Sequence, residues 1–258
     1  ILKINAVAIT KNNLIDGAVL VFHDITELYR LENIRKDFIA NVSHELRTPI
    51  SNIKGYAETL LEGALEDKKN AKEFINIIYQ EANRMASLIE DLLDLSKIES
   101  GKIKMSFSKL EIEPIIKRSI NILENGIKNK KLSININIQK DIPRVIADDT
   151  RLTQVFLNLL DNAIKYTDEG GKINIDVFKN DNFVQVDITD TGIGIPEKDL
   201  PRIFERFYRV DKSRSRELGG TGLGLSIVKH IILAHNGKIW VNSKLGCGST
   251  FSFTIPCA

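Results

Sequence analysis

The sequence has few cysteines and no long apolar run, and these absences exclude several classes of protein. Cys247 and Cys257 are the two cysteines among 258 residues, and no CxxC spacing joins them. A disulfide framework or a zinc site is therefore not expected, which fits a reducing cytosol. No apolar stretch reaches the roughly 18 residues of a membrane-spanning helix, and no signal peptide is evident. We expect this stretch of chain to be cytoplasmic.

The sequence also lacks a strong excess of either charge. Its 36 Lys and Arg residues against 34 Asp and Glu residues give a net charge of +2, with both signs interspersed. Such a balance argues against bulk electrostatic binding, so no nucleic-acid partner is expected. The first residue is Ile1 and not Met, which suggests a fragment of a longer protein. A membrane segment of that protein, if it has one, would lie upstream of residue 1.

The first 26 residues resemble the end of another domain. Residues 4–9 and 18–22 are strand-like runs on either side of residues 11–17, which is the pattern of a β-hairpin. Two strands alone are marginally stable, so they need a partner. Asp24 or Thr26 can then cap the helix that follows.

Residues 27–101 are predicted to form a helical hairpin. Apolar residues keep helical spacing from Leu28 to about Leu65, residues 63–70 interrupt it, and a second helix runs from about 71 to 100 and ends at Gly101. Two antiparallel helices cannot bury a full apolar face against each other alone. A homodimer through residues 27–101 that forms a four-helix bundle solves this problem. A plain dimerising coiled coil is the alternative.

Residues 102–258 are predicted to form an α/β sandwich. Helices are expected over residues 110–129, 148–167 and 221–235. Strands are expected where polar and apolar residues alternate, at 133–138, 172–178, 183–189, 238–241 and 249–255. Helices that cover one face of a largely antiparallel sheet make such a sandwich. The predicted fold class is therefore multi-domain, with an all-α hairpin followed by an α/β domain.

The direction of His44 is the most informative feature of the first helix. At about 100° per residue from Phe38, the apolar residues gather near 50° and His44 falls near 240°. His44 therefore faces solvent, and Thr48 lies one turn along on the same side. Pro49 cannot donate a backbone hydrogen bond, so a kink or loosened turn is expected there. Taken alone, His44 is also compatible with an ordinary surface histidine.

Three further stretches carry groups that suit a phosphorylated ligand. Asn158, Asn162 and Lys165 (or Tyr166) share one helix face, and such a face suits Mg²⁺ bound to phosphates. A polar outer helix face is the alternative. Asp190 follows a strand and precedes a tight turn at Gly192 and Gly194. Its carboxylate could accept a hydrogen bond from an amine, although glycine turns after strands are common.

A glycine-rich stretch opens directly into the last predicted helix. It runs Gly219-Gly220-Thr221-Gly222-Leu223-Gly224 and matches neither a Walker loop nor a Rossmann turn. Free N–H groups and the helix dipole favour phosphate at such a helix start. The preceding basic stretch from Arg209 to Leu218 has the composition of a mobile lid over an anion, or of a solvated loop.

Together these stretches are far more specific than each is alone. Five of them occur in this order: His44-Glu45-Leu-Arg-Thr48-Pro49, Asn158 to Lys165, Asp190-Thr-Gly192-Ile-Gly194, Phe204 to Arg209, and Gly220-Thr221-Gly222-Leu223-Gly224. The chain closely resembles the sensor histidine kinases of bacterial two-component systems over about residues 28–256, and the stretches match that family's H, N, G1, F and G2 boxes. Residues 1–26 look like the tail of a PAS sensor domain.

The resemblance implies a role for each matched residue. It implies an ATP-binding domain of the GHKL type, ATP as substrate and His44 as phosphoacceptor, with Glu45 as its acid/base neighbour. It implies that Asp190 binds the adenine amino group. Asn158 and Asn162 would neutralise phosphate charge together with Mg²⁺, for which Asn162 is the ligand. The other implied ATP-binding residues are Lys165, Tyr166, Arg209, Gly192, Gly194, Gly220, Thr221, Gly222, Leu223 and Gly224.

The resemblance also implies a second reaction partner for the histidine. A response regulator would receive the phosphoryl group on an aspartate, and Thr48 matches the family's phosphatase position. Two other readings stay open at this point: an ATPase of the wider fold shared with DNA gyrase and MutL, and a dimeric scaffold that binds nucleotide only for regulation. His44-Glu45 on a separate helical hairpin argues against the ATPase.

Overall fold

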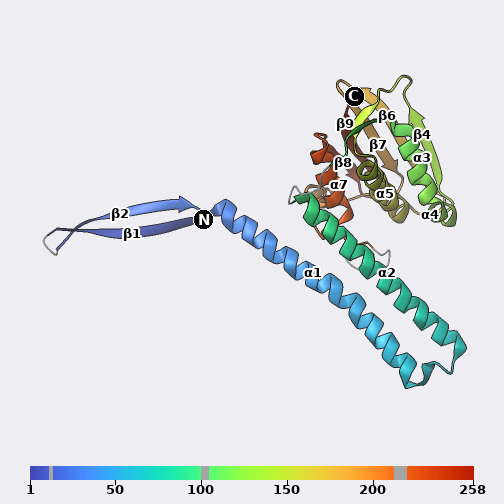
Figure 1. Ribbon diagram of the computed structural model, residues 1–258, viewed down its shortest axis with the longest axis horizontal. Coiled ribbons are helices and arrows are strands. Elements are labelled where there is room, and N and C mark those ends of the chain that lie inside the picture. The colour runs from blue at the N-terminus through green and yellow to red at the C-terminus, as the bar shows by residue number, and fades with distance from the viewer. Residues whose placement is uncertain (12–13, 100–104, 212–219) are drawn as a thin grey trace. The chain divides into compact units, whose positions relative to one another are not determined.

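A computed structural model describes residues 1–11, 14–99, 105–211 and 220–258 of the chain (Figure 1). The chain divides into two compact units, Ile1–Glu81 and Ala82–Ala258. Within the described ranges, no helix combines the length and the apolar character that a membrane span requires.

The N-terminal unit begins with the predicted β-hairpin. Strands β1 (Leu2–Lys11) and β2 (Leu14–Asp24) pair antiparallel, with a shift of register after Ile9. Apolar side chains on both strands remain exposed, including Leu2 at 59% and Phe22 at 56%. Because a two-stranded ribbon is marginally stable in water, this exposure indicates that the hairpin needs a further partner.

Helix α1 (Thr26–Thr59) starts where the sequence predicted. The Asp24 carboxylate accepts hydrogen bonds from the backbone N–H of Thr26 at 2.9 Å and from its hydroxyl at 2.6 Å. The helix continues past the buried Pro49, although proline cannot donate to the carbonyl of Glu45 four residues earlier. Pro49 therefore does not end the helix.

A short π-helical turn joins α1 to the second long helix. This turn, η1 (Leu60–Ala64), contains Gly63 at φ +125°, a conformation that only glycine adopts readily, and α2 (Lys68–Glu99) follows. The predicted interruption near residues 63–70 is confirmed, whereas the predicted helix end at Gly101 lies outside the described residues.

Helix α1 contacts the first part of α2 near this turn. The rings of Tyr56 and Phe74 lie 5.3 Å apart, and the Asn52 side-chain amide donates to the Glu81 carboxylate at 2.9 Å. Farther up α1, a stripe of large apolar side chains is exposed. It comprises Leu28, Leu31, Ile34 and Ile39, each 41% exposed or more. Within the described residues of the N-terminal unit, nothing covers this stripe.

The C-terminal unit is built on a five-stranded sheet. In spatial order its strands are β4 (Ser133–Ile138), β6 (Lys172–Asn180), β7 (Phe183–Asp190), β9 (Gly248–Pro256) and β8 (Ile239–Lys244). The pair β4–β6 is parallel, and the other three pairs are antiparallel. The predicted, largely antiparallel sheet is confirmed.

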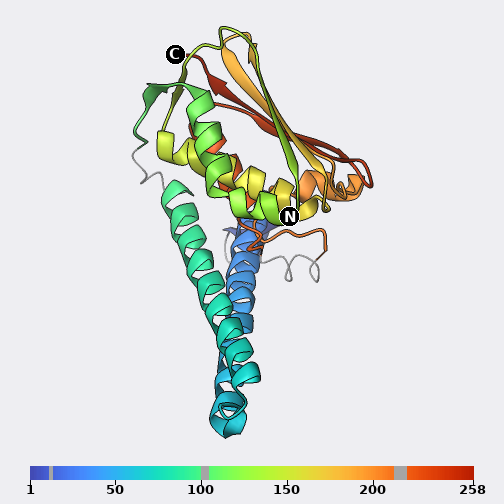
Figure 2. The same ribbon diagram turned by 90° about the vertical axis from the view of Figure 1, so that its right-hand side faces the viewer.

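Helices cover one face of this sheet, as Figure 2 shows. They are α3 (Ile112–Ile122), α4 (Glu124–Asn129), α5 (Asp149–Tyr166) and α7 (Gly224–Ala234). The single helix predicted over residues 110–129 is therefore two helices. Among the described residues of this unit, three short elements were not predicted: the paired strands β3 (Ser108–Leu110) and β5 (Val145–Ala147), and the 3₁₀ helix η2 (Glu197–Arg202).

Helix α5 lies at the centre of the C-terminal unit. Its apolar residues recur at helical spacing and are buried, and the Phe156 ring meets the Phe253 ring of β9 edge to face at 5.5 Å. The side chain of Asp148 caps the helix by accepting from the Arg151 N–H at 3.1 Å. Burial of this stripe decides which residues of α5 face outward.

A buried histidine holds the start of α5. The ring of His235 is 1% exposed; its Nε2 atom accepts from the Asp148 N–H at 3.0 Å, and its Nδ1 atom lies 2.8 Å from the carbonyl of Ile231. These two partners require the neutral ring with the proton on Nδ1. Burial lowers the pKa of His235, against the opposing effects of the Ile231 carbonyl and the Asp148 carboxylate.

This arrangement predicts that the C-terminal unit loses stability on mild acidification. Because an unfolded histidine has a pKa of about 6.5 and folded His235 a lower one, the unfolded chain gains a proton first as the pH falls below about 6.5. His235→Gln retains an acceptor for Asp148 but does not titrate. The thermal unfolding midpoint of His235→Gln should fall less than that of the wild type between pH 7.5 and pH 5.5. The fluorescence of the single tryptophan, Trp240, reports this midpoint.

His23→Gln is the matched control, because His23 is exposed on β2. It should keep the pH dependence of the wild type. An equally steep loss in His235→Gln would show that another group causes the loss.

Candidate functional site

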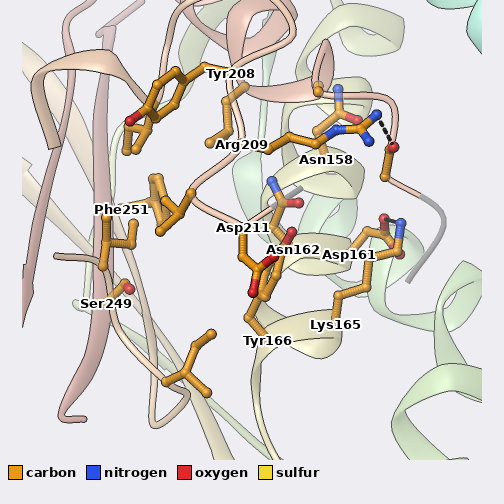
Figure 3. A pocket seen from close by; sticks show the side chains of 18 of the residues that line it. Asn158, Asp161, Asn162, Lys165, Tyr166, Tyr208, Arg209, Asp211, Ser249 and Phe251 are labelled. Carbon is orange, nitrogen blue, oxygen red and sulfur yellow. Dashed lines mark hydrogen bonds and ion pairs between the residues drawn. The ribbon is translucent and has the colours of Figure 1, made fainter. Parts of the chain in front are cut away.

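A pocket in the C-terminal unit gathers most of the residues singled out from the sequence. It lies among α5, the loop after β7, the segment after η2 and the start of α7 (Figure 3). The predicted residues that line it are Asn158, Asn162, Lys165, Tyr166, Asp190, Gly194, Arg209, Gly220, Thr221, Gly222 and Gly224. Gly192 and Leu223 are buried in the same two loops without lining the pocket.

The polar stripe of α5 forms one wall. Figure 3 shows that Asn158, Asn162 and Lys165 reach the pocket from successive turns of the helix. The Lys165 ammonium pairs with the Asp161 carboxylate at 2.6 Å. Asn158 also lies beside the first residue of α7, since a side chain at Gly224 would meet its Oδ1 atom at 3.3 Å. Amide, ammonium and helix N-terminus are all groups that bind phosphate oxygens.

Asp190 lies at the end of β7, where the strand gives way to the glycine turn. It is 6% exposed, and its Oδ1 atom accepts from the Gly192 N–H at 2.8 Å. Burial raises the pKa of Asp190, while hydrogen bonds from the backbone of Gly192 and Ser249 oppose that rise. A carboxylate has about four acceptor positions, so it can still accept from a ligand.

The glycine turn after β7 packs tightly against the last turn of α5. A Cβ atom at Gly192 would collide with the carbonyl oxygen of Tyr166, so only glycine fits there. The next residue, Ile193, donates its N–H to the same carbonyl at 3.2 Å. The position of Asp190 therefore depends on where α5 ends.

The glycine-rich stretch before α7 is tied to the segment that follows η2. Gly222 has φ +75° and accepts a hydrogen bond from the Phe207 N–H at 2.8 Å, and the Arg209 guanidinium donates to the carbonyl of Gly220. Thr221 donates its hydroxyl to Asp91 at 2.8 Å. The predicted lid falls largely on residues 212–219, which lie outside the described residues.

Sequence reasoning missed the apolar wall of the pocket. Ile193, Ile195, Ile203, Tyr208 and Phe251 supply it. The Tyr208 hydroxyl donates to the Asp199 carboxylate at 2.6 Å, and this bond raises the pKa of Tyr208. Alternation along β9 was visible in the sequence. Phe251 faces this pocket because β9 pairs with β7 in this register. No local sequence pattern predicts that pairing.

The donor set of the pocket bears on which metal it could hold. The described part of the chain contains no cluster of three or more His, Cys, Asp or Glu side chains able to hold an ion. The pocket offers amide oxygens of Asn158 and Asn162 and the carboxylate of Asp161. A site with few protein oxygens suits Mg²⁺, because this ion keeps several waters and binds mainly through phosphates. Such a site does not suit a metal that needs a full cage of protein ligands.

The other predicted residues lie in the N-terminal unit. His44 is exposed on α1, as the helical rotation predicted, and Glu45 and Thr48 are partly exposed. The Thr48 hydroxyl donates to the carbonyl of His44 at 3.3 Å, so the two residues are in contact across one helical turn. The structure thus provides an exposed imidazole on one unit, and on the other unit a pocket lined by groups that can bind phosphate.

Comparisons with known proteins match both units. Residues 34–101 match the family described as "His Kinase A (phospho-acceptor) domain", and residues 147–258 match "Histidine kinase-, DNA gyrase B-, and HSP90-like ATPase". The chain is 40% identical over 259 residues to the sensor histidine kinase WalK of Bacillus subtilis, covering 99% of this chain and 42% of the relative. It is 39% identical to the sensor protein kinase WalK of Staphylococcus aureus, covering 96% of this chain and 60% of the relative.

A solved structure agrees over the whole chain. Histidine kinase ThkA, crystallised with the response regulator protein TrrA, is 30% identical with a TM-score of 0.71, and the match covers 100% of this chain and 75% of that one. The chain spans between two fifths and three fifths of the length of the two WalK relatives. The fold, the ordered sequence stretches and these matches agree: the chain belongs to the sensor histidine kinases.

Proposed function

We propose that this chain transfers the γ-phosphoryl group of ATP to His44 and then to an aspartate of a response regulator. The observation that carries the proposal is the convergence of the α5 polar stripe, Asp190 and the start of α7 on one pocket. The carboxylate of Asp190 matches the amino group of adenine. The polar stripe of α5 and the N-terminus of α7 match the phosphates of an adenine nucleotide. Membership of the family supplies the remaining support.

In this proposal the nucleotide spans the pocket from its apolar wall to α7. Asp190 accepts a hydrogen bond from the adenine amino group, and the base lies against Ile193, Ile195 and Phe251. The glycines of the two loops, Gly192 and Gly194 and then Gly220, Gly222 and Gly224 with Thr221 and Leu223, let the backbone approach the ligand. Asn158, Asn162, Lys165, Tyr166 and Arg209 surround the phosphates.

Mg²⁺ fits the polar end of this pocket. The amide oxygen of Asn162 would hold it together with phosphate oxygens, in keeping with the sparse protein ligands that this ion accepts. When bound, the ion supplies neutralisation of phosphate charge. Lys165 and Arg209 contribute further positive charge from the chain itself.

The phosphotransfer itself requires a neutral imidazole at His44. One ring nitrogen attacks the γ-phosphorus, the new N–P bond forms, the bond from that phosphorus to the bridging oxygen breaks, and ADP leaves. Glu45, the next residue, orients the ring and takes the proton from the other ring nitrogen. In the transfer to a regulator aspartate, an O–P bond forms as the N–P bond breaks, and Glu45 returns the proton to the imidazole that leaves.

The proposed domains follow the same division of roles. Residues 27–101 form the dimerisation and phosphotransfer domain, residues 102–258 the ATP-binding domain, and residues 1–26 the tail of a PAS domain. The exposed stripe Leu28, Leu31, Ile34 and Ile39 supports a homodimer, because a second copy of α1 would bury it. The complex of ThkA with TrrA supports a response regulator as partner.

The test of the central proposal is phosphorylation of His44. Incubation with labelled ATP and Mg²⁺ should give acid-labile, base-stable label on the wild type and none on His44→Gln, because no other group is the proposed acceptor. His23→Gln, which changes another exposed histidine, should label normally. Label that survives His44→Gln contradicts the proposal, and ATP hydrolysis without any label favours a simple ATPase.

The role of Asp190 predicts a change of base preference. Asp190→Asn replaces one acceptor oxygen by an amide donor, which opposes the adenine amino group but suits the carbonyl of hypoxanthine. Because a hydrogen bond to a charged group is worth about 1.5–3 kcal/mol, ATP affinity should fall about tenfold or more. Affinity for inosine triphosphate should fall less. An equal loss for both nucleotides, measured by calorimetry, would mean that Asp190 does not read the base.

Thr48 is proposed to orient water for dephosphorylation of the regulator. Thr48→Ala should keep His44 labelling within about twofold while slowing loss of label from the phosphorylated regulator about a hundredfold, the lower end of what one positioned catalytic group contributes. Ser51→Ala is the matched control on the same exposed helix face and should change neither rate. Equal loss of both activities in Thr48→Ala would remove the separate role of Thr48.

A further inference from the structure

Lys130 follows α4 and directs its ammonium group at the end of α5. The Nζ atom donates three hydrogen bonds, to the carbonyls of Ile164 at 2.8 Å, Lys165 at 2.8 Å and Thr167 at 2.9 Å. Since an ammonium group has three donors, all of them are used on this one helix end. A lysine on an exposed loop ordinarily satisfies its charge with water, whereas this one is partly buried.

These carbonyls lie at the C-terminal end of α5, where backbone carbonyls lack the N–H donors that they have inside a helix. The last four carbonyls of a helix have no intrahelical donor, and they form the negative end of its dipole. In α5, Lys130 supplies donors to the carbonyls on either side of Tyr166, and the Tyr166 carbonyl accepts from the Ile193 N–H at 3.2 Å. One cation and one backbone amide thereby fix four consecutive carbonyls.

The same turn connects the two ends of the pocket. Lys165 and Tyr166 line the pocket from the helix, and the Tyr166 carbonyl contacts the loop that carries Asp190 and Gly192. Lys130 does not line the pocket. Its own carbonyl accepts from the Gly170 N–H at 2.9 Å, so the chain leaving α5 is held by the same residue.

We infer that Lys130 is a positioning residue for nucleotide binding. Its three hydrogen bonds set the axial position of the last turn of α5, which places Lys165 and Tyr166 and, through Ile193, the loop of Asp190. This inference rests on the proposed function, because the nucleotide is the ligand that the two ends of the pocket must hold in register. Small displacements of binding groups are costly in such sites.

The test compares Lys130→Met with Lys131→Met in the full chain. Methionine keeps the apolar stem at position 130 and removes every donor. Lys131 offers a matched control, because it is the next residue, carries the same charge, and pairs with Glu169 at 2.6 Å on the exposed surface. Such an exposed pair contributes little, so its loss should leave the site unchanged.

ATP affinity is measured by calorimetry below the unfolding midpoints of both variants. Lys130→Met should raise the Kd for ATP about tenfold or more, whereas Lys131→Met should stay within about twofold of the wild type. Lys130→Arg keeps the charge and several donors but presents them on a larger planar group, so its affinity should lie between those of Lys130→Met and the wild type. Hydrogen exchange at the Ile193 amide should be faster in nucleotide-free Lys130→Met, because its acceptor turn has loosened.

The outcomes separate positioning from general stability. Equal ATP affinities for folded Lys130→Met and Lys131→Met overturn the inference even if Lys130→Met melts at a lower temperature, and so does unchanged exchange at Ile193. If Lys130→Met does not fold, Lys130→Gln, which keeps two donors, takes its place with the same expected order of affinities. A wild type that does not bind ATP would instead contradict the proposed function, before any variant is compared.

Discussion

The amphipathic division of α5 is the constraint on which the C-terminal unit depends. One stripe of the helix packs on the sheet, with Phe156 against Phe253, and the opposite stripe supplies Asn158, Asn162 and Lys165 to the pocket. A slip of one residue would turn the helix by about 100° and bury amides in an apolar layer without hydrogen-bond partners. Burial of the apolar stripe therefore fixes the direction of the polar one.

Apolar packing alone does not fix how far the helix slides along the sheet, because the hydrophobic effect has no direction. Directional hydrogen bonds do so at both ends. At the start, Asp148 accepts from Ser106 and Arg151 while His235 accepts from the Asp148 N–H. At the end, Lys130 binds three carbonyls. The two kinds of interaction thus determine separate coordinates of the same helix, its rotation and its axial position.

Most of the fold was predictable because its elements are long enough to show their period. The hairpin, both long helices and the five strands of the sheet all follow from alternation or helical spacing. Strands β3 and β5 have three residues each, too few for a period to emerge. The break between α3 and α4 at Leu123 was missed because apolar residues continue across it. Local patterns fail where an element is short or its end is set by tertiary contact.

The candidate site divides in the same way. Glycines, Asn158, Asn162 and Asp190 stand out because they form contiguous motifs, whereas Phe251 depends on strand pairing and Lys130 on contacts 34 to 37 residues along the chain. His44 was predictable for the opposite reason, since exposure needs only helical rotation and no partner within the chain. In the proposed function His44 must meet two reaction partners and therefore remains exposed, whereas the nucleotide would be enclosed by many fixed groups. Residues that merely support the enclosed site are therefore the ones that sequence motifs leave hidden.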